Sequence, residues 1–412
     1  MQSTLYAQET ALEQVLDGLI QNALLHGKAF ALWRQPKTST LHFLADDSGE
    51  LKRVQADLEQ LPAGFIAHPF ADQADEKAYF IAADVHETFS LEQATCAWPE
   101  HQGAPAEPPK QLLPWSQLAP LLAPVRMQER EKGGYRSPKQ REEHQYSHFI
   151  QTVQEAIAAI QRGELRKVVP ARTKHVPLQE HFSPARALLA LANAYPNAFV
   201  NFFHLPQVGT WMGASPETLV RTRGAQFYTM SLAGTQVASV KDPLKHAAWT
   251  QKEIEEQALV SRYIVDCFKK IRLREYEEIG PKTVVAGHLL HLRSDFFVDM
   301  EATNFPQLGS VMLRLLHPTS AVCGMPREAA HRFLRQHEQL DRSLFAGYMG
   351  PVQVQGMCSI YVNLRTARLT PEGALLFAGA GVTEDSDPEK EWRETELKCA
   401  TIARHLHPDP QD

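Results

Sequence analysis

Two glutamates and a lysine near the end of the chain have the types and spacing of a site for a cation and an anion. Glu391, Glu394 and Lys398 lie three and four positions apart in the run EWRETELK, so a helix would place their side chains on one face. Carboxylates one turn apart can bind a hard divalent cation, and the lysine can meet an acidic group of a substrate. An ordinary solvated helix with a Glu–Lys pair has the same spacing, so the pattern alone leaves both alternatives open.

A second pair of glutamates lies on another expected helix, over residues 245–270. Glu253 and Glu256 are three positions apart in this helix. Four carboxylates that converged would repel one another unless a cation lay between them. If the two pairs meet they therefore imply a metal, and oxygen ligands alone favour Mg²⁺. The order of segments along the chain does not show whether they meet.

Lys167 and Glu217 are candidates for acid–base chemistry. Lys167 lies beside Val168 and Val169 in an expected strand, where partial desolvation would favour the neutral amine that a general base requires. Glu217 closes the turn GASPE, and burial there would make its carboxyl group a general acid. A solvent-facing strand lysine and a capping glutamate are the alternative interpretations of these positions.

Composition and charge exclude several classes of protein. A chain of 412 residues can bury a large core, and a net charge of −6 does not indicate a nucleic-acid partner. Five cysteines without a CxxC motif predict free thiols, not a zinc site or a disulfide framework. The first residues form an amphipathic pattern without a basic start, and no apolar run is long enough to span a membrane. We therefore expect a cytoplasmic protein without a membrane partner.

The order of elements predicts an α+β fold with large antiparallel sheets packed between helices. Helical periodicity is clear over residues 10–25 and about 143–162, whereas most strands follow one another as meanders. A segment rich in Pro, Gln and charge, over about 98–138, is typical of a long surface connection. It separates an N-terminal lobe with its linker, residues 1–140, from a catalytic region, residues 141–412. We expect the lobe to be structural and packed on the rest.

A series of motifs between about residues 146 and 405 resembles the chorismate-utilising enzymes, the family of isochorismate, salicylate, anthranilate and aminodeoxychorismate synthases. The motifs occur in the family's order and read GELRKVV, GASPE, LAGT, KEIEEQ, HPTSAVCGMPREAA, DRSLFAGYMG, VNLRTA, FAGAGV and EWRETELK. The HPTSAVCGMPREAA segment and the last motif are most similar to isochorismate synthases. The resemblance implies the anthranilate/isochorismate synthase fold.

The resemblance also implies roles for the candidate residues. Mg²⁺ would be bound by carboxylates and by the ring carboxylate of chorismate, with Glu256 and Glu394 as direct ligands and Glu253 and Glu391 acting directly or through water. Lys167 would activate a water that attacks C2 of the ring, and Glu217 would protonate the departing C4 hydroxyl. Substrate contacts are implied for Gly234, Thr235, His291, Arg365, Gly379, Gly381 and Lys398.

Single residues help to choose within the family. Lys167 stands where anthranilate synthases carry Gln, and Ala233 stands where many aminodeoxychorismate synthases carry a nucleophilic Lys. Ammonia chemistry and a glutamine amidotransferase subunit are therefore not expected, and the resemblance implies an isochorismate synthase, as a monomer or weak homodimer. Salicylate synthase, which also eliminates pyruvate from isochorismate, remains the alternative. A homologue that binds chorismate without turnover is the non-enzyme alternative.

Two positions depart from many relatives: Ser231 replaces Pro, and Gln257 replaces His.

Overall fold

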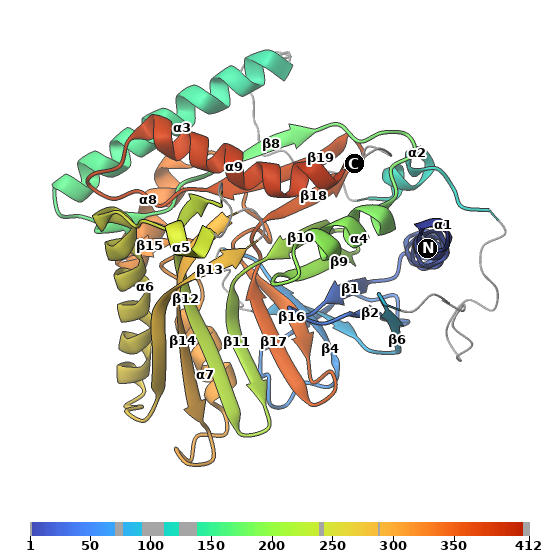
Figure 1. Ribbon diagram of the computed structural model, residues 1–412, viewed down its shortest axis with the longest axis horizontal. Coiled ribbons are helices and arrows are strands. Elements are labelled where there is room, and N and C mark those ends of the chain that lie inside the picture. Colours follow the sequence, from blue (N-terminus) through green and yellow to red (C-terminus); the bar gives the residue numbers. More distant parts are fainter. Residues whose placement is uncertain are drawn as a thin grey trace.

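Two large sheets dominate the computed structural model, which describes residues 2–70, 77–92, 111–122, 138–238, 243–286 and 289–406. Neighbouring strands with a printed register are antiparallel in both sheets, and helices pack on their faces (Figure 1). The predicted α+β class with large antiparallel sheets is confirmed. Among the described residues, no helix has the length and apolar character needed to cross a membrane.

The eight-stranded sheet joins strands from both ends of the chain. Strand β1 pairs with β9, with Leu32 opposite Phe202, although the two residues lie far apart in sequence. From edge to edge the sheet contains β6 (Val85–Ser90), β2 (Thr40–Ala45), β1 (Phe30–Arg34), β9 (Phe199–Leu205), β10 (Gly209–Ser215), β18 (Thr366–Thr370), β19 (Gly373–Gly379) and β8 (Ala171–Val176).

The nine-stranded sheet also mixes early and late strands, because β4 pairs with β16. Its order is β13 (Glu277–Ala286), β14 (Leu289–Asp299), β12 (Gln226–Val237), β11 (Thr218–Arg223), β17 (Met357–Val362), β16 (Tyr348–Val352), β4 (Gly64–His68), β5 (Ala78–Ala82) and β3 (Lys52–Val54). A separate short ladder joins β7 (Lys167–Val168) to β15 (Gly324–Met325), with Lys167 opposite Met325.

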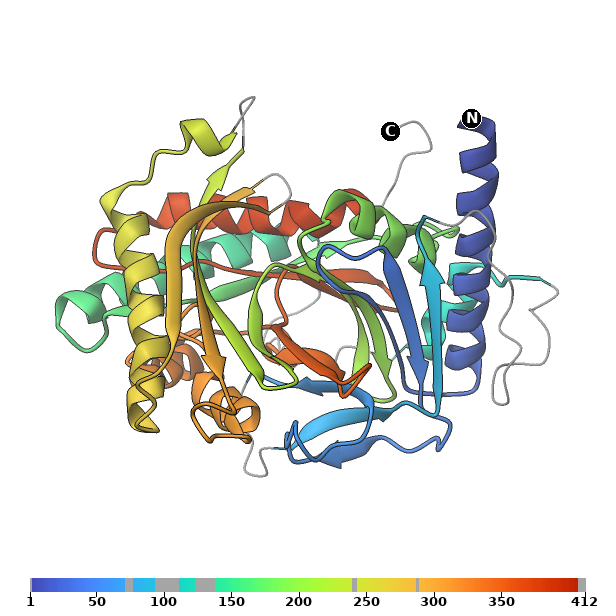
Figure 2. The same ribbon diagram turned by 60° about the horizontal axis from the view of Figure 1, so that its bottom comes forward.

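The helices cover these sheets in groups. Figures 1 and 2 show α3 and α9 running together along one side, while α1 and α6 stand at opposite ends of the molecule. The eight-stranded sheet packs against α1 (Gln2–Leu25), α4 (Pro184–Ala194) and α9 (Pro388–Leu406). The nine-stranded sheet packs against α6 (Gln251–Lys270) and α7 (Leu308–Leu316). The others are α2 (Trp115–Leu118), η1 (Ala119–Leu121), α3 (Pro138–Gln161), α5 (Pro243–His246) and α8 (Arg327–His337).

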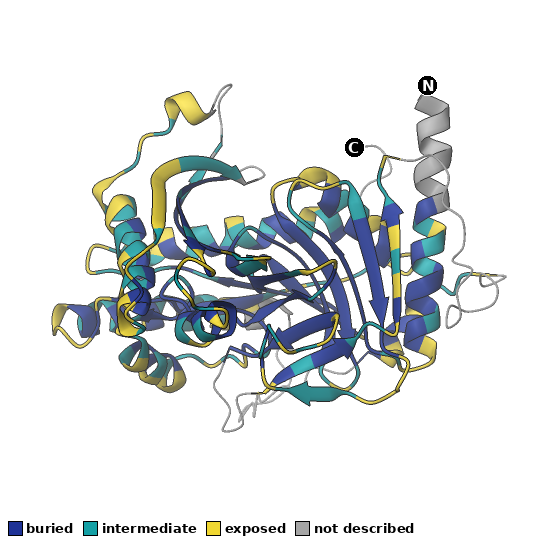
Figure 3. Cartoon of the chain, turned by 90° about the horizontal axis from the view of Figure 1, so that it is seen from below, coloured by how far each residue is buried: buried dark blue, intermediate teal, exposed yellow. Residues whose placement is uncertain are grey.

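Strand β9 shows why the central strands are apolar on both faces. Side chains alternate along a strand, so Phe199 and Phe203 enter one core while Val200 and Phe202 enter the other. The first core lies between the sheets, where the ring of Phe199 stacks on that of Tyr361 with centroids 4.0 Å apart. Figure 3 shows the result, with buried strands in the middle and exposed residues on helices, loops and the edge strand β13.

Two sequence-based expectations differ from the structure. The helix expected over 245–270 begins at Gln251, because Thr250 and Glu253 close its first turn as a capping box. The connection expected over 98–138 is only partly described. Its residues 111–122 lie at the surface with one side buried, since Trp115 and Leu118 belong to the second core while Ser116 and Gln117 are exposed. The rest of the connection lies outside the described residues.

Candidate active site

A cavity opens where β12, β14 and β19 approach helices α6 and α9. It encloses about 750 Å³ of space free of atoms, part of it open to solvent. The size is that of a site for a small molecule. Nine of the site residues expected from the sequence line it: Glu217, Gly234, Thr235, Glu256, His291, Arg365, Gly379, Glu394 and Lys398. The structure thus brings together residues that are widely separated in sequence.

Lys167 lies behind this lining and reaches it through Glu256. Its side chain is fully buried, and Nζ donates a 2.7 Å hydrogen bond to Oε1 of Glu256. Burial acts to raise the pKa of Glu256. The charge and hydrogen bond of Lys167, together with the charges of Lys398 and Lys252, outweigh burial and hold that pKa below its ordinary value. Gly381 makes the contact possible: a Cβ there would lie 2.6 Å from Oε1 of Glu256 and 3.0 Å from Cε of Lys167.

Glu217 is the buried acid of the cavity. It follows β10, and its side chain is almost fully removed from solvent. Burial raises its pKa from 4.5 to about 8, although the charge of Lys167 and the neighbouring Thr319 hydroxyl act in the opposite direction. At neutral pH the carboxyl group is therefore mostly protonated. A protonated carboxyl facing a cavity can donate a proton to a leaving group.

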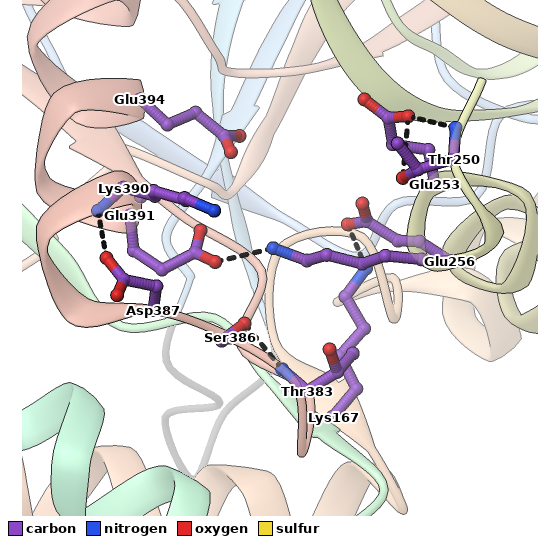
Figure 4. A network of polar contacts seen from close by, with 12 residues as sticks. Lys167, Thr250, Glu253, Glu256, Thr383, Ser386, Asp387, Lys390, Glu391 and Glu394 are labelled. Carbon is purple, nitrogen blue, oxygen red and sulfur yellow. Dashed lines mark hydrogen bonds and ion pairs between the residues drawn. The ribbon is translucent and has the colours of Figure 1, made fainter. Parts of the chain in front are cut away.

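The carboxylates of α6 and α9 face one another across the site (Figure 4). Glu391 is buried and accepts a 2.5 Å hydrogen bond from Nζ of Lys252, while Glu394 forms a 2.6 Å ion pair with Lys398. Burial raises the pKa of Glu391. Burial acts to lower the pKa of Lys252, but the charge and hydrogen bond of Glu391, with the charges of Glu394 and Glu256, together raise it. Each of these carboxylates therefore has its own ammonium partner.

Glu253 takes a different role from the other three glutamates. It is the third residue of α6, and its Oε2 accepts hydrogen bonds from the backbone N–H of Thr250 at 2.7 Å and from the Thr250 hydroxyl at 3.0 Å. Gln236 also donates to it. Figure 4 shows Glu253 bound to the start of its own helix, and it does not line the cavity.

The residues present fit a hard divalent cation in type and in place. Glu256 and Glu394 line the same cavity from two different helices, and carboxylate oxygens are the ligands that Mg²⁺ prefers. Within the described part of the chain, however, no group of three or more His, Cys, Asp or Glu side chains lies close enough to bind one metal ion. The sequence left open whether the four carboxylates meet. Glu256 and Glu394 line the cavity, whereas Glu253 and Glu391 are not among its lining residues.

His291 presents a hydrogen-bond acceptor to the cavity. Its Nδ1 lies 2.7 Å from the carbonyl oxygen of Gly234, and because a carbonyl only accepts, this nitrogen carries the proton. Burial, with a smaller effect of the Arg365 charge, lowers the pKa of His291 to about 3. The ring is neutral at physiological pH, so Nε2 has a free lone pair. It can accept a hydrogen bond from a hydroxyl group of a ligand.

Two cationic side chains, Arg365 and Lys398, line the cavity. Burial lowers the pKa of Arg365 to about 10, which leaves the guanidinium charged at neutral pH. Its Nη1 donates a hydrogen bond to the Thr401 hydroxyl, and its other N–H groups can donate to a ligand. Lys398 lies between the carboxylate of Glu394 and the carbonyl oxygen of Gly379, to which Nζ donates at 2.7 Å.

Gly234 is a glycine for reasons of both conformation and space. Its φ of +71° lies in the left-handed region, and a Cβ would approach the ring of Trp249 to 3.2 Å. The Trp249 indole in turn donates to Thr283 on β13. The backbone beside Thr235 can therefore come close to a ligand in the cavity.

Three residues near the site were not singled out by sequence reasoning: Lys252, Thr319 and Arg342. All three lie inside motifs that mark the resemblance, namely KEIEEQ, HPTSAV and DRSLFAG. The motifs gave their positions but not their contacts. Lys252 binds Glu391, Thr319 lies beside Glu217, and Arg342 lines the cavity.

Comparison with known proteins agrees with the resemblance that the sequence motifs indicated. The family model described as "Chorismate binding enzyme" matches residues 107–407. The salicylate biosynthesis isochorismate synthase of Pseudomonas aeruginosa is 33% identical over 267 residues, which cover 62% of this chain and 53% of that protein. The isochorismate synthase EntC of Escherichia coli K12 is 30% identical over 261 residues, covering 62% of this chain and 66% of that protein. The chain thus spans about half to two thirds of the length of these curated relatives.

The fold is shared with solved structures at lower identity. MenF, the menaquinone-specific isochorismate synthase of Escherichia coli, superposes with a TM-score of 0.65 at 20% identity, covering 92% of this chain and 89% of that one. Anthranilate synthase component I of Streptococcus pneumoniae gives a TM-score of 0.60 at 16% identity, covering 91% and 90% of the two chains. At these identities the likeness shows the fold alone.

Proposed function

Because the chain belongs to the family of chorismate binding enzymes, we propose that it is an isochorismate synthase that converts chorismate reversibly to isochorismate. The observation that carries the proposal is the buried pair of opposite acid–base character: Glu217, with a pKa of about 8, and Lys167, whose charge acts on it. The names of the curated relatives support the same reaction.

In the proposed reaction, a hydroxyl group is added at one ring carbon and another is lost from a second. Lys167 must first lose to solvent the ammonium proton that it carries in its ion pair with Glu256. It then takes a proton from a water while the water oxygen bonds to C2. The ring double bonds shift and the C4–O bond breaks. Glu217 gives its proton to the departing hydroxyl, which leaves as water. A proton must then return from Lys167 to Glu217, and the net change is an isomerisation without redox chemistry.

The cations of the cavity would bind the acidic groups of chorismate. Arg365 offers a planar fork to a carboxylate, and Lys398 offers a point charge close to Gly379. His291 Nε2 would accept a hydrogen bond from a ring hydroxyl. The three groups come from β14, the segment after β17, and α9, so they contact different sides of one small ligand.

Glu256 and Glu394 would bind Mg²⁺, with Glu391 as a further or water-mediated ligand. When bound, the ion would neutralise the ring carboxylate and so help to fix the substrate. Glu256 then has two possible partners, the metal and Lys167. Glu253 is the weakest candidate of the four glutamates, because its carboxylate closes the first turn of α6.

Product analysis tests the proposal. The purified protein is incubated with chorismate, with and without Mg²⁺, and the products are separated by chromatography. Isochorismate in equilibrium with chorismate, formed only with the metal, is the expected result. Salicylate and pyruvate as main products would assign the protein to the salicylate synthases instead. Saturable chorismate binding without any product would contradict an enzymatic role.

A further inference from the structure

Arg342 and Glu338 form a buried ion pair beside the cavity that the proposed reaction does not use. Nε and Nη2 of Arg342 donate to Oε1 and Oε2 of Glu338, each at 2.7 Å, in a bidentate arrangement. Their side chains are 4% and 6% exposed. Glu338 caps the end of α8, and Arg342 follows four residues later. A pair so far removed from water must be fully hydrogen-bonded to be tolerated.

The remaining donors of Arg342 bind backbone on two different segments. Nη2 donates to the carbonyl oxygen of Val169 at 2.6 Å, and Nη1 donates to that of Val322 at 2.9 Å. Oε2 of Glu338 also accepts the backbone N–H of Ala171 at 2.9 Å. The ion pair thus binds the backbone on both sides of Pro170. We call these two side chains, with their three backbone contacts, the Arg342–Glu338 clamp.

The first segment bound by the clamp carries Lys167. Strand β7 has only two residues, Lys167 and Val168, and pairs with β15 on one side and Val382 on the other. So short a strand has few bonds of its own to fix its position. The clamp binds the chain two and four residues after Lys167, and so limits where its ammonium group can lie.

The second segment bound by the clamp contains Thr319, the neighbour of Glu217. Val322 belongs to the loop after Pro318, in which the backbone N–H groups of Val322 and Cys323 both donate to the carbonyl oxygen of Thr319. Thr319 lies beside the Glu217 carboxyl. A single guanidinium group therefore joins the segment of Lys167 to the loop that contacts Glu217.

We propose that the Arg342–Glu338 clamp is a positioning device that fixes the relative placement of Lys167 and Glu217, and that Arg342 does not bind the substrate. The inference rests on the proposed isochorismate synthase function. Arg342 lines the cavity, but four of its five N–H groups are committed to the clamp. Its charge is balanced by Glu338, and its guanidinium group lies 4.2 Å over the ring of Phe70. Arg365 and Lys398 are better placed to meet an anion.

Kinetics of Arg342→Lys test the clamp. Lysine keeps the charge but cannot bind a carboxylate and two carbonyl groups in one plane. A misplacement of about 1 Å costs on the order of 100-fold in rate. We therefore expect kcat to fall about 100-fold while KM for chorismate stays close to the wild-type value. A higher KM with an unchanged kcat would show that Arg342 binds substrate, and unchanged values of both would also overturn the inference.

Two further variants separate positioning from general loss of stability. Arg34→Lys is the matched control, because Arg34 is equally buried and donates to the carbonyl groups of Tyr195 and Pro196, away from the clamp. It should lower the melting temperature without lowering kcat to the same extent. The double variant Arg342→Met/Glu338→Gln removes both buried charges and should be more stable than Arg342→Met alone. Its kcat should remain low, and recovery of kcat with stability would contradict positioning.

Amide hydrogen exchange tests the clamp without any substrate. Ala171 loses its charged acceptor when Glu338 is displaced, so its N–H should exchange faster in Arg342→Lys than in the wild type and in Arg34→Lys. If the wild-type protein does not convert chorismate, the proposed function fails, and exchange alone decides on the clamp. Faster exchange confined to residues 165–172 and 319–323 supports it, and unchanged exchange there contradicts it.

Discussion

Lys167 Nζ lies 2.7 Å from Oε1 of Glu256, so the residue assigned to the base is bound to a residue assigned to the metal. The lysine is fully buried and the glutamate side chain is 19% exposed. Removing either partner should lower the stability of the fold, because the remaining charge would be unpaired and poorly solvated in this buried position. The contact joins β7 to α6 at the cavity.

Removing the lysine should affect stability and turnover differently. Lys167→Met leaves Glu256 without its partner, and breaking a buried pair costs about 3–5 kcal/mol. The double variant Lys167→Met/Glu256→Gln should regain most of this free energy of unfolding, yet neither variant should turn over chorismate. Chemical denaturation and initial rates measure the two properties. Turnover near the wild-type rate in Lys167→Met would exclude the lysine as general base.

Gly381→Ala should disrupt the same contact from the other side. The added methyl group would meet Glu256 Oε1 at 2.6 Å and Lys167 Cε at 3.0 Å, so the two side chains must move apart. We expect a loss of activity together with a lower melting temperature, because the buried pair is disrupted, and initial rates and thermal denaturation measure the two effects. Gly163→Ala is a control for backbone strain without a steric contact, since the φ of Gly163 is +75° but no atom lies within 4 Å of a Cβ there. Equal activity in both variants would contradict the tight contact at Gly381.

The raised pKa of Glu217 predicts a pH dependence of stability. In the unfolded chain this carboxyl loses its proton near pH 4.5, whereas in the folded protein it keeps it until about pH 8. Between these values the folded state binds more protons, so this group lowers stability as pH rises from 4.5 to 8. Glu217→Gln should remove that part of the decline in the free energy of unfolding. Identical pH profiles for the two proteins would mean that the carboxyl is not buried as described.

The same group should set the alkaline limit of activity. A general acid must be protonated, and kcat/KM reports the pKa values of the free enzyme, so kcat/KM should fall as pH rises through about 8. The measurement is kcat/KM for chorismate against pH. A profile that stays flat to pH 10 would require another proton donor.

The four glutamates should differ in their effect on Mg²⁺ binding. A ligand that binds only the folded state stabilises it by about 2.7 kcal/mol at 100 times its Kd, which raises the melting temperature. Glu256→Gln and Glu394→Gln should abolish this rise. Glu253→Gln should keep it, because glutamine also completes a capping box and Glu253 does not line the cavity. Loss of the rise in Glu253→Gln would show that Glu253 also acts on the metal.

Spacing along single elements was the most predictable part of the site. The face of α9 that carries Glu391, Glu394 and Lys398 follows from positions three and four apart, and the structure confirms the helix. Apolar runs such as that of β9 likewise predicted buried strands. These features depend on local periodicity, which the sequence contains directly.

Contacts between distant segments were not predictable in the same way. The contact of Glu253 with Thr250 was not predicted, because it depends on where α6 begins, and sequence patterns place the start of a helix only to within a few residues. The clamp could not be found, because Arg342 binds the backbone carbonyl groups of Val169 and Val322, and any residue type presents such a group.

The origin of the oxygen in the product tests the central claim most directly. The protein is incubated briefly with chorismate and Mg²⁺ in H₂¹⁸O, and isochorismate is isolated for mass spectrometry before the reverse reaction proceeds. If Lys167 activates water at C2, each isochorismate molecule formed early carries one ¹⁸O atom, at the C2 hydroxyl. Isochorismate without label would show that the hydroxyl group moves within the molecule, and absence of isochorismate would contradict the proposed function itself.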